Sequence, residues 1–561
     1  MTVQDRPGRG RGPERGPKGR ALNDAALKDV QALLASRPRR RDLLIEFLHL
    51  IQDKYGCLAA VHLRALAEEM RMAQAEVYEV ASFYDHFDVV REGEAKPAPL
   101  TIRICDSISC MIAGAEELLL ELQAGVDSKA IRVLRAPCMG RCAGAPAARI
   151  GDRELDHATG DLLIKMAREG DTKTIVPDYI ALDAYRAAGG YQLLGKVRDG
   201  SVQVDNIIEV MQKAGLRGLG GAGFSAGKKW SIVRSFAGPR LMSINGDEGE
   251  PGTFKDRAFL EKDPHRTLEG ALIAAHAVDA QRVYFYMRDE YPAVLHILRT
   301  EIAALEAAGL IDPGFVDLRR GAGAYICGEE SAMLESIEGK RGIPRNRPPY
   351  IAEVGLFGRP TLNHNVETLW WIRDIIEKGA EWFAALGKPD HPGIRSWSVS
   401  GRVKDPGVKL APAGITVREL VDDFCGGMAE GHQFTAYLPG GASGGILPAS
   451  MDDIPLDFGG ELAKKGAFVG SHAVVIFSNK DSPKAATVNL LKFFTHESCG
   501  QCTPCREGTG KMVALLQKQG PLNETAIRDL ETVMRDASIC GLGQAAPNPV
   551  NHLLMYFRED I

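Results

Sequence analysis

The cysteines of this 561-residue chain constrain its fold more than any other feature. Eight of the eleven fall into two sets of four. The first set is Cys105, Cys110, Cys138 and Cys142, and the second is Cys499, Cys502, Cys505 and Cys540. A disulfide framework would not group them in this way, and in a cytosolic chain such grouping indicates metal binding. The isolated Cys57, Cys327 and Cys425 are interpreted as packed thiols.

The first set has the spacing C-x4-C followed, 27 residues later, by C-x3-C. Four thiolates are what a [2Fe–2S] cluster requires, two for each iron. Zinc is the alternative, because four cysteines also bind zinc tetrahedrally, but zinc sites favour the shorter C-x2-C spacing. The spacing therefore favours iron and sulfide over zinc.

The second set begins with C-x2-C-x2-C in ESCGQCTPCREG. Three closely spaced thiolates and one remote thiolate are typical of a [4Fe–4S] cluster. A bacterial ferredoxin run would place the fourth cysteine soon after the third, whereas residues 506–508 here are Arg-Glu-Gly. Cys540 is the one cysteine that follows Cys505, so we expect it to be the fourth ligand; a zinc site is again the alternative.

Composition excludes several classes of function. The formal charge of -5 gives no overall reason to expect nucleic-acid binding, and no apolar run approaches the length of a membrane span. Residues 1–20 are basic and rich in Gly and Pro, with no apolar stretch typical of a secretory signal. We expect a disordered tail, with surface tethering or nucleic-acid contact as the alternative, and a cytoplasmic protein.

A glycine-rich segment, GLRGLGGAGFSAGKKW (215–230), contains G-x-G-x-x-G at Gly218, Gly220 and Gly223. A standard Rossmann fingerprint follows a strand. Here the preceding residues 206–215 have a helical pattern, which disfavours that interpretation. Glycines without Cβ atoms still allow the backbone to approach a phosphate or ring closely, and the neighbouring lysines suit an anion. A surface turn is the alternative.

Two acidic segments accompany this loop. NGDEGEPGTFKDR (245–257) follows an apparent strand, RLMSI, and GAGAYICGEESAMLESIEGKRG (321–342) places Glu329 and Glu330 before a helix. Adjacent carboxylates repel and need hydrogen-bond donors unless they stay solvated. Ribose hydroxyls are suitable donors. A solvated acidic helix start is the alternative.

Secondary structure can be predicted around both cysteine sets. Residues 21–90 show helical periodicity. Strands are expected at 100–105 and 131–137 with a helix near 113–124 between them, which suggests a small α/β sandwich. Helices are expected at 484–495 and 521–535, next to the second set. Segments VSGRVKDPG and YLPGGASGGIL, within 392–470, have the pattern of strands and turns.

These motifs resemble two complex I families. CDSISC and APCMGRCAGAP, with the helical segment before them, resemble the 24-kDa-type thioredoxin-like [2Fe–2S] subunit over residues 21–175. From residue 178 onward, GLRGLGGAGF, NGDEGEPGTFKDR, GAYICGEES, PTLNHNVETL and ESCGQCTPCREG resemble the 51-kDa-type flavin subunit, in family order.

The resemblance implies a multidomain α/β protein that binds FMN, NAD, one [2Fe–2S] cluster and one [4Fe–4S] cluster. The expected parts are a tail (1–20), a helical bundle (21–95), a thioredoxin-like [2Fe–2S] domain (96–177), a Rossmann-like FMN/NAD domain (178–391), a β-grasp (SLBB-like) insert (392–470) and a four-helix [4Fe–4S] bundle (471–561).

By matching motifs, the resemblance also implies roles for individual residues. FMN would be held by Gly218, Gly220, Lys229, Asn245, Asp247, Tyr325, Gly328, Asn365 and Thr368. Phe224 and Tyr350 would stack on the NAD adenine. Glu329 and Glu330 would meet the ribose and flavin edges, with Glu330 repelling the 2′-phosphate of NADP. Glu250 would lie near the nicotinamide, so Glu250 and Glu330 are the expected catalytic residues.

One residue departs from the family pattern. His364 takes the place of the first Asn in N-N-V-E-T. It could donate a hydrogen bond to the flavin and shift its potential, or it could be a packing substitution.

The fusion of both modules further resembles the β subunit of soluble, NAD-dependent formate dehydrogenases. A molybdenum- or tungsten-containing α subunit with further iron–sulfur clusters would then oxidise formate, and NAD⁺ would accept hydride from FMN. The rival interpretations are the diaphorase of an NAD-reducing hydrogenase, a fused complex I subunit, and a non-catalytic nucleotide-binding electron-relay scaffold. The complete first cysteine set and the lack of an added C-terminal ferredoxin pair favour formate dehydrogenase.

Overall fold

The computed structural model describes residues 19–561, which form two compact units that meet at Pro97 and Ala98. Almost all of the predicted tail, residues 1–20, lies outside this described part. Within residues 19–561, no helix is long and apolar enough to cross a membrane.

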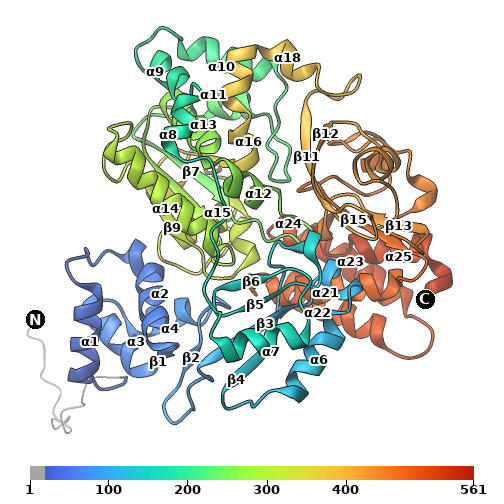
Figure 1. Ribbon diagram of the computed structural model, residues 1–561, viewed down its shortest axis with the longest axis horizontal. Coiled ribbons are helices and arrows are strands. Elements are labelled where there is room, and N and C mark those ends of the chain that lie inside the picture. Colours follow the sequence, from blue (N-terminus) through green and yellow to red (C-terminus); the bar gives the residue numbers. More distant parts are fainter. Residues whose placement is uncertain (1–18) are drawn as a thin grey trace, which may run out of the picture. The chain divides into compact units, whose positions relative to one another are not determined.

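The first unit is helical, as its sequence periodicity predicts (Figure 1). Phe47, Leu48 and Ile51 are buried on one face of the second helix, and the backbone at Gly56 ends that helix in the left-handed conformation. Two short strands pair in parallel next to the helices. The elements are α1 (Asp24–Leu34), α2 (Leu44–Tyr55), β1 (Leu58–Ala59), α3 (Ala60–Glu69), α4 (Gln74–Ala81) and β2 (Val89–Val90).

The second unit begins with a sheet of strand order β4-β3-β5-β6. The predicted strand–helix–strand pattern is confirmed, because β3 and β4 are parallel and α6 connects them. Parallel strands end at the same edge, so Cys105 at the end of β3 lies near the loop that follows β4. The elements are β3 (Leu100–Cys105), α6 (Ala115–Gly125), β4 (Ile131–Ala136), β5 (Ala148–Ile150), β6 (Arg153–Leu155) and α7 (Gly160–Glu169).

A second sheet is wholly parallel, with strand order β10-β7-β8-β9. Its apolar residues, such as Met242, Ile244 and Phe285, are fully buried in the largest core of the unit. Helices pack against it, as in a Rossmann-like fold (Figure 1). The elements are α10 (Val204–Lys213), α11 (Ala226–Ser235), β7 (Arg240–Gly246), α13 (Pro264–Ala277), β8 (Ala280–Met287), α14 (Pro292–Ala307), β9 (Val316–Arg320), α15 (Glu330–Ile337), β10 (Thr361–Asn365) and α16 (Val366–Trp370).

A third sheet has the order β12-β11-β15-β13-β14 and contains the strands expected in the insert. Its central strand β15 pairs with both β11 and β13. The insert was predicted to end at residue 470, but the sheet continues through β15, so this boundary was placed too early. The reason is that β15 is a fully buried apolar run without the alternation that marks a half-exposed strand. The strands are β11 (Ile394–Gly401), β12 (Gly407–Pro412), β13 (Phe434–Leu438), β14 (Leu447–Pro448) and β15 (Ala473–Ser478).

The C-terminal segment consists of helices, and the second cysteine set lies at the turns between them. Cys499 and Cys502 follow α21, Cys505 lies in the first turn of α22, and Cys540 caps α24. The helices are α21 (Pro483–Glu497), α22 (Thr503–Gln517), α23 (Glu524–Ala537), α24 (Gly541–Ala545) and α25 (Asn548–Tyr556).

Close packing of α13 against α16 leads to a testable consequence. A Cβ atom added at Gly270 would lie 2.0 Å from the carbonyl oxygen of Leu369, which is backbone and cannot rotate away. Gly270→Ala should therefore lower the free energy of unfolding by roughly 1–3 kcal/mol, despite the better helix propensity of alanine. Gly195→Ala is the control, because this exposed helical glycine has nothing within 4 Å of an added Cβ, and it should be neutral or slightly stabilising. Calorimetric unfolding of both variants would test the contrast.

Candidate functional site

The first four cysteines are buried together at the carboxyl ends of β3 and β4. The Sγ atoms of Cys138 and Cys142 are 3.4 Å apart, and the thiol of Cys105 lies within hydrogen-bond reach of those of Cys110 and Cys138. Backbone N–H groups of Gly140 and Ala147 donate to Cys138 and Cys110, at 3.4 Å each. Hydrogen bonds from the thiols of Cys105 and Cys142 hold the pKa of Cys138 well below its ordinary value.

The second four cysteines approach one another from two turns. The thiols of Cys499, Cys502 and Cys505 interact electrostatically, and that of Cys540 interacts with Cys499. Burial raises the pKa of Cys505 to about 11 and that of Cys540 to about 12. Four cysteine donors are what a [4Fe–4S] cluster requires, and because a cluster binds thiolates, its assembly would release the protons of these thiols.

Zinc is the alternative metal for both cysteine sets. Tetrahedral zinc with bonds of about 2.3 Å would bring its sulfur ligands within about 3.8 Å of one another. Over residues 19–561, the group with three potential ligand atoms all within 4.8 Å is His49, Asp53 and His86, and it contains no cysteine. The preference for iron–sulfur clusters over zinc therefore rests on the spacing of the cysteines in the sequence.

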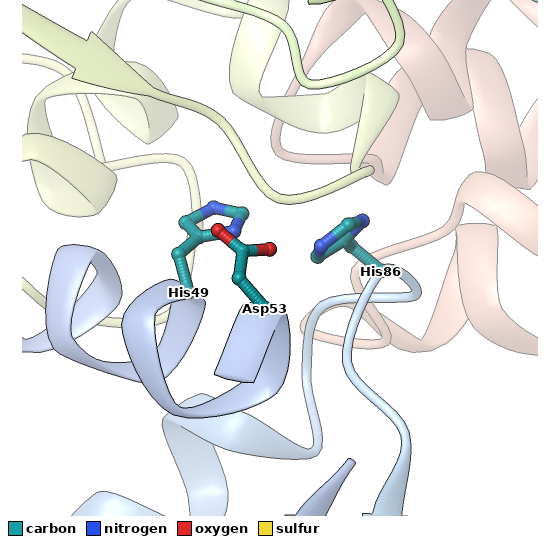
Figure 2. Close-up of side chains that lie close together, drawn as sticks. All are labelled: His49, Asp53 and His86. Atoms are coloured by element: carbon teal, nitrogen blue, oxygen red, sulfur yellow. The ribbon is translucent and has the colours of Figure 1, made fainter. Parts of the chain in front are cut away.

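The histidine–aspartate group itself was not predicted from the sequence. Figure 2 shows His49 and Asp53 one turn apart on α2, with His86 reaching toward them from the loop after α4. The side-chain amide of Gln52 donates to the backbone carbonyl of His86 and accepts from the N–H of Asp88. The H-x3-D spacing was the signal that could have found this group. Without sulfur ligands it belongs to neither predicted cluster.

The glycine-rich loop connects two helices, α10 and α11, which confirms that it is not a standard Rossmann turn. The N–H of Gly218 donates to the carbonyl of Phe224 at 2.8 Å, and the N–H of Leu219 donates to the buried hydroxyl of Thr368 at 2.9 Å. A Cβ atom at Gly220 would lie 3.0 Å from that of Asn365. The loop is thus folded tightly over the end of β10, with no room for side chains at its centre.

Polar groups line the carboxyl edge of the parallel sheet. Asn245 and Asn365 are neighbours in register at the ends of β7 and β10. Asn245 donates to the carbonyl of Gly328 at 2.9 Å and accepts from the N–H of Asp247 at 3.0 Å. The Oδ2 atom of Asp247 is buried without a hydrogen-bond partner, and burial raises the pKa of Asp247 well above its ordinary value. An orphaned acceptor at this edge fits a bound group with N–H or O–H donors, such as FMN.

Two lysine side chains lie near the carboxyl edge of the parallel sheet. Lys229 on α11 donates to the carbonyl of Asn363 at 3.1 Å, and burial lowers its pKa. Lys255 is buried between the carboxylates of Asp256 and Glu367, at 2.7 and 3.1 Å. Burial opposes the charge of Lys255, but these carboxylates raise its pKa overall. The sequence analysis did not single out Lys255, although it lies in the motif NGDEGEPGTFKDR.

The adjacent Glu329 and Glu330 have different environments. Glu329 caps α15, because its carboxylate accepts from the N–H groups of Ser331 and Ala332 at 3.0 and 2.9 Å. The side chain of Glu330 is 26% exposed, lies 4.0 Å from Lys229 and is 3.2 Å from Arg347. Glu329 thus forms the helix cap, whereas the carboxylate of Glu330 takes no part in it.

Arg347 was also missed by the sequence analysis. Its guanidinium contacts both Glu329 and Glu330, and lies 6.0 Å from the ring centroid of Tyr350. Phe224 and Tyr350 are 43% and 59% exposed, which is unusual for large aromatic side chains. Such exposed rings next to charged side chains are suited to stacking on a base.

Glu250 lies among hydrogen-bond donors from distant segments. Its carboxylate accepts from the hydroxyl of Tyr325 and, at 2.8 Å, from the N–H of Ser443 in the third sheet's connecting loop. Burial raises the pKa of Glu250. The N–H of Tyr325 in turn donates to Glu497 at the end of α21, at 2.9 Å. These bonds connect loops near the carboxyl edge of the parallel sheet β10-β7-β8-β9 to the helix that precedes the second cysteine set.

His364 contacts Trp230 in this structure. Its Nε2 atom accepts from the indole N–H of Trp230 at 2.7 Å, and burial holds its pKa well below the ordinary value. The neutral imidazole is therefore held by a helix side chain. Of the two roles considered for His364, this geometry supports the packing substitution.

Comparisons with known proteins agree with these sites. Residues 30–169 match the thioredoxin-like [2Fe-2S] ferredoxin family, residues 211–374 the Nuo51 FMN-binding domain, and residues 485–561 the NADH-ubiquinone oxidoreductase-F iron-sulfur binding region. The chain therefore contains domains for a [2Fe–2S] cluster, FMN with NAD, and a [4Fe–4S] cluster.

Relatives extend the match beyond single domains. The second F-type subunit of NADH-quinone oxidoreductase from Rhizobium meliloti (strain 1021) is 41% identical over 69% of this chain and 94% of the relative. The F-type subunit from Aquifex aeolicus (strain VF5) is 39% identical over 72% and 94%. A crystal structure of an NAD+-reducing [NiFe]-hydrogenase in the air-oxidized state contains a chain of TM-score 0.81 and 32% identity, with 94% of both chains covered. The chain belongs to the family of F-type subunits of NADH-quinone oxidoreductase, and carries a thioredoxin-like [2Fe–2S] domain in front of the part that matches them.

Proposed function

We propose that this chain is the diaphorase subunit of a larger redox complex, which transfers electrons between NAD(H) and iron–sulfur clusters. The observation that carries the proposal is that the orphaned Asp247 carboxylate, the tightly folded glycine loop and two sets of four free cysteines lie in one compact unit. When bound, FMN supplies the conversion between two-electron hydride chemistry and one-electron transfer to the clusters.

The residues of the chain would provide binding and orientation. Asn245, Asp247 and Asn365 would hold the flavin at the sheet edge, with Lys229 near its anionic end. Phe224 and Tyr350 would stack on the adenine, and Glu330 would accept from a ribose hydroxyl. Glu329 would meet the ribose or flavin edge, as the resemblance implies, in addition to capping α15.

The partner is best supported as a hydrogenase or complex I module, because the relatives above are named as such. The hydrogenase chain is the more suggestive of the two, since it aligns with both halves of this chain. A formate-oxidising α subunit containing molybdenum or tungsten is the second candidate, favoured by the complete set Cys105, Cys110, Cys138 and Cys142.

Two measurements test this function. The anaerobically purified chain should release FMN on heating, and NADH should bleach its flavin absorbance and reduce an artificial acceptor. A chain that binds nucleotide but shows no bleaching would be a relay scaffold instead. Metal analysis of the co-purified complex distinguishes the partners: nickel indicates a hydrogenase, and molybdenum or tungsten a formate dehydrogenase.

A substitution of Cys540 would distinguish the signals of the two clusters. Cys540→Ala should abolish the EPR signal and iron of the [4Fe–4S] cluster and keep those of the [2Fe–2S] cluster, because its thiol belongs to the second set alone. Cys425→Ala, at an isolated buried thiol in the third sheet domain, is the control and should keep both. Loss of both clusters in Cys540→Ala, with the fold intact, would contradict the assignment.

Glu330 should discriminate between NAD and NADP. Glu330→Gln removes the charge that repels a 2′-phosphate, so the ratio of kcat/KM for NADPH to that for NADH should rise. The effect should be about tenfold or more, equivalent to about 1.4 kcal/mol. Glu353→Gln removes a nearby exposed charge and should leave the ratio unchanged. An unchanged ratio in Glu330→Gln would count against this role.

A further inference from the structure

One buried arginine contacts both the first cysteine loop and the flavin-site loop. Arg288 follows the end of β8 and is 4% exposed. Its Nη2 atom donates to the backbone carbonyl of Cys138 at 2.6 Å, and its Nη1 atom donates to the carbonyl of Glu248. A single guanidinium thus contacts a residue of the first cysteine set and the residue next to Asp247.

The surroundings fix the guanidinium in place. Its carbon lies 4.9 Å from the ring centroid of Tyr291, whose hydroxyl donates to the carboxylate of Glu248 at 3.1 Å. A Cβ atom at Gly140 would lie 1.9 Å from that hydroxyl, so the cysteine loop is packed directly on Tyr291. Arg288 is therefore clamped between the two loops and cannot turn to solvent.

The charge of Arg288 is only partly compensated. Its Nε atom donates to Glu290 at 3.1 Å, and the side chain of Glu290 is 19% exposed. The neighbouring Asp289 is paired with Arg149 and Arg320 instead. Besides this ion pair, the guanidinium contacts the uncharged backbone carbonyls of Cys138 and Glu248.

A fixed, buried cation stabilises whichever state of a nearby group carries more negative charge. Reduction adds one electron to a [2Fe–2S] cluster, and cluster potentials depend on net charge and on hydrogen bonds around the ligands. We propose that Arg288 is a positioning residue that raises the reduction potential of the [2Fe–2S] cluster, with Glu290 as its counter-charge. This inference rests on the proposed role of the first cysteine set as cluster ligands.

The two loops share this cation, so the flavin site and the cluster site are electrostatically connected. The fixed guanidinium stabilises negative charge at either site, because it lies against the backbone carbonyls of both Glu248 and Cys138. Arg288 consequently acts on both sites without contacting substrate.

Two variants that should shift the midpoint potential in opposite directions test the proposal. The full chain, loaded anaerobically with both clusters, would be titrated with dithionite and followed by EPR. Arg288→Gln should shift the [2Fe–2S] midpoint potential to more negative values, because the cation is lost. Glu290→Gln should shift it to more positive values, because the compensating charge is lost. Arg288→Lys keeps the charge and should lie between wild type and Arg288→Gln.

The [4Fe–4S] signal in the same samples is the internal control, and Arg234→Gln, at an exposed arginine of α11, should shift neither signal. Shifts of the same sign in Arg288→Gln and Glu290→Gln, or no shift in either, would overturn the proposal. If Arg288→Gln does not retain its cluster, the positive shift in Glu290→Gln decides alone. Wild-type protein without a [2Fe–2S] signal would instead contradict the proposed cluster site.

Discussion

Burial of charge is the constraint on which the rest of this structure depends. The second unit holds carboxylates, a lysine and five of the eight grouped cysteines away from water, and charged forms of these groups would be costly there without a partner. The charge of Lys255 is compensated within the protein, by the carboxylates of Asp256 and Glu367. The thiols of Cys505 and Cys540 have raised pKa values, and the Asp247 carboxylate has no hydrogen-bond partner on one oxygen. In the proposed function, the cofactors would supply the missing partners.

This constraint explains why the sites lie where they do. Carboxyl ends of parallel strands gather loops at one edge of a sheet, and both the first cysteine set and the pair Asn245 and Asn365 lie at such an edge. The second cysteine set uses helix turns instead, where the N–H groups of Leu542 and Gly543 are directed at the Cys540 thiol. Sheet edges and helix turns thus both bring together polar groups that could surround a cofactor.

Much of this could be predicted from the sequence, because the signals were local. Cysteine spacing predicted both clusters, and the strand–helix–strand pattern at residues 100–137 predicted the first sheet. The end of the insert was missed because β15 is apolar on both faces and reveals no period. Arg288, Arg347 and Ser443 were missed for another reason: their roles depend on contacts with residues far away in the chain. The cap that Glu329 forms at the start of α15 was not predicted either.

The first cysteine domain is also held by segments that come much later in the chain. Ser109 bonds to Ser400 at 2.9 Å, Arg402 donates to the carbonyl of Ile112 at 2.7 Å, and Asn489 donates to the carbonyl of Asp106 at 2.7 Å. During synthesis, the domain emerges from the ribosome well before these partners exist. Its final surroundings can form only once the C-terminal helices have been made, so completion of this metal centre is delayed until translation is nearly finished.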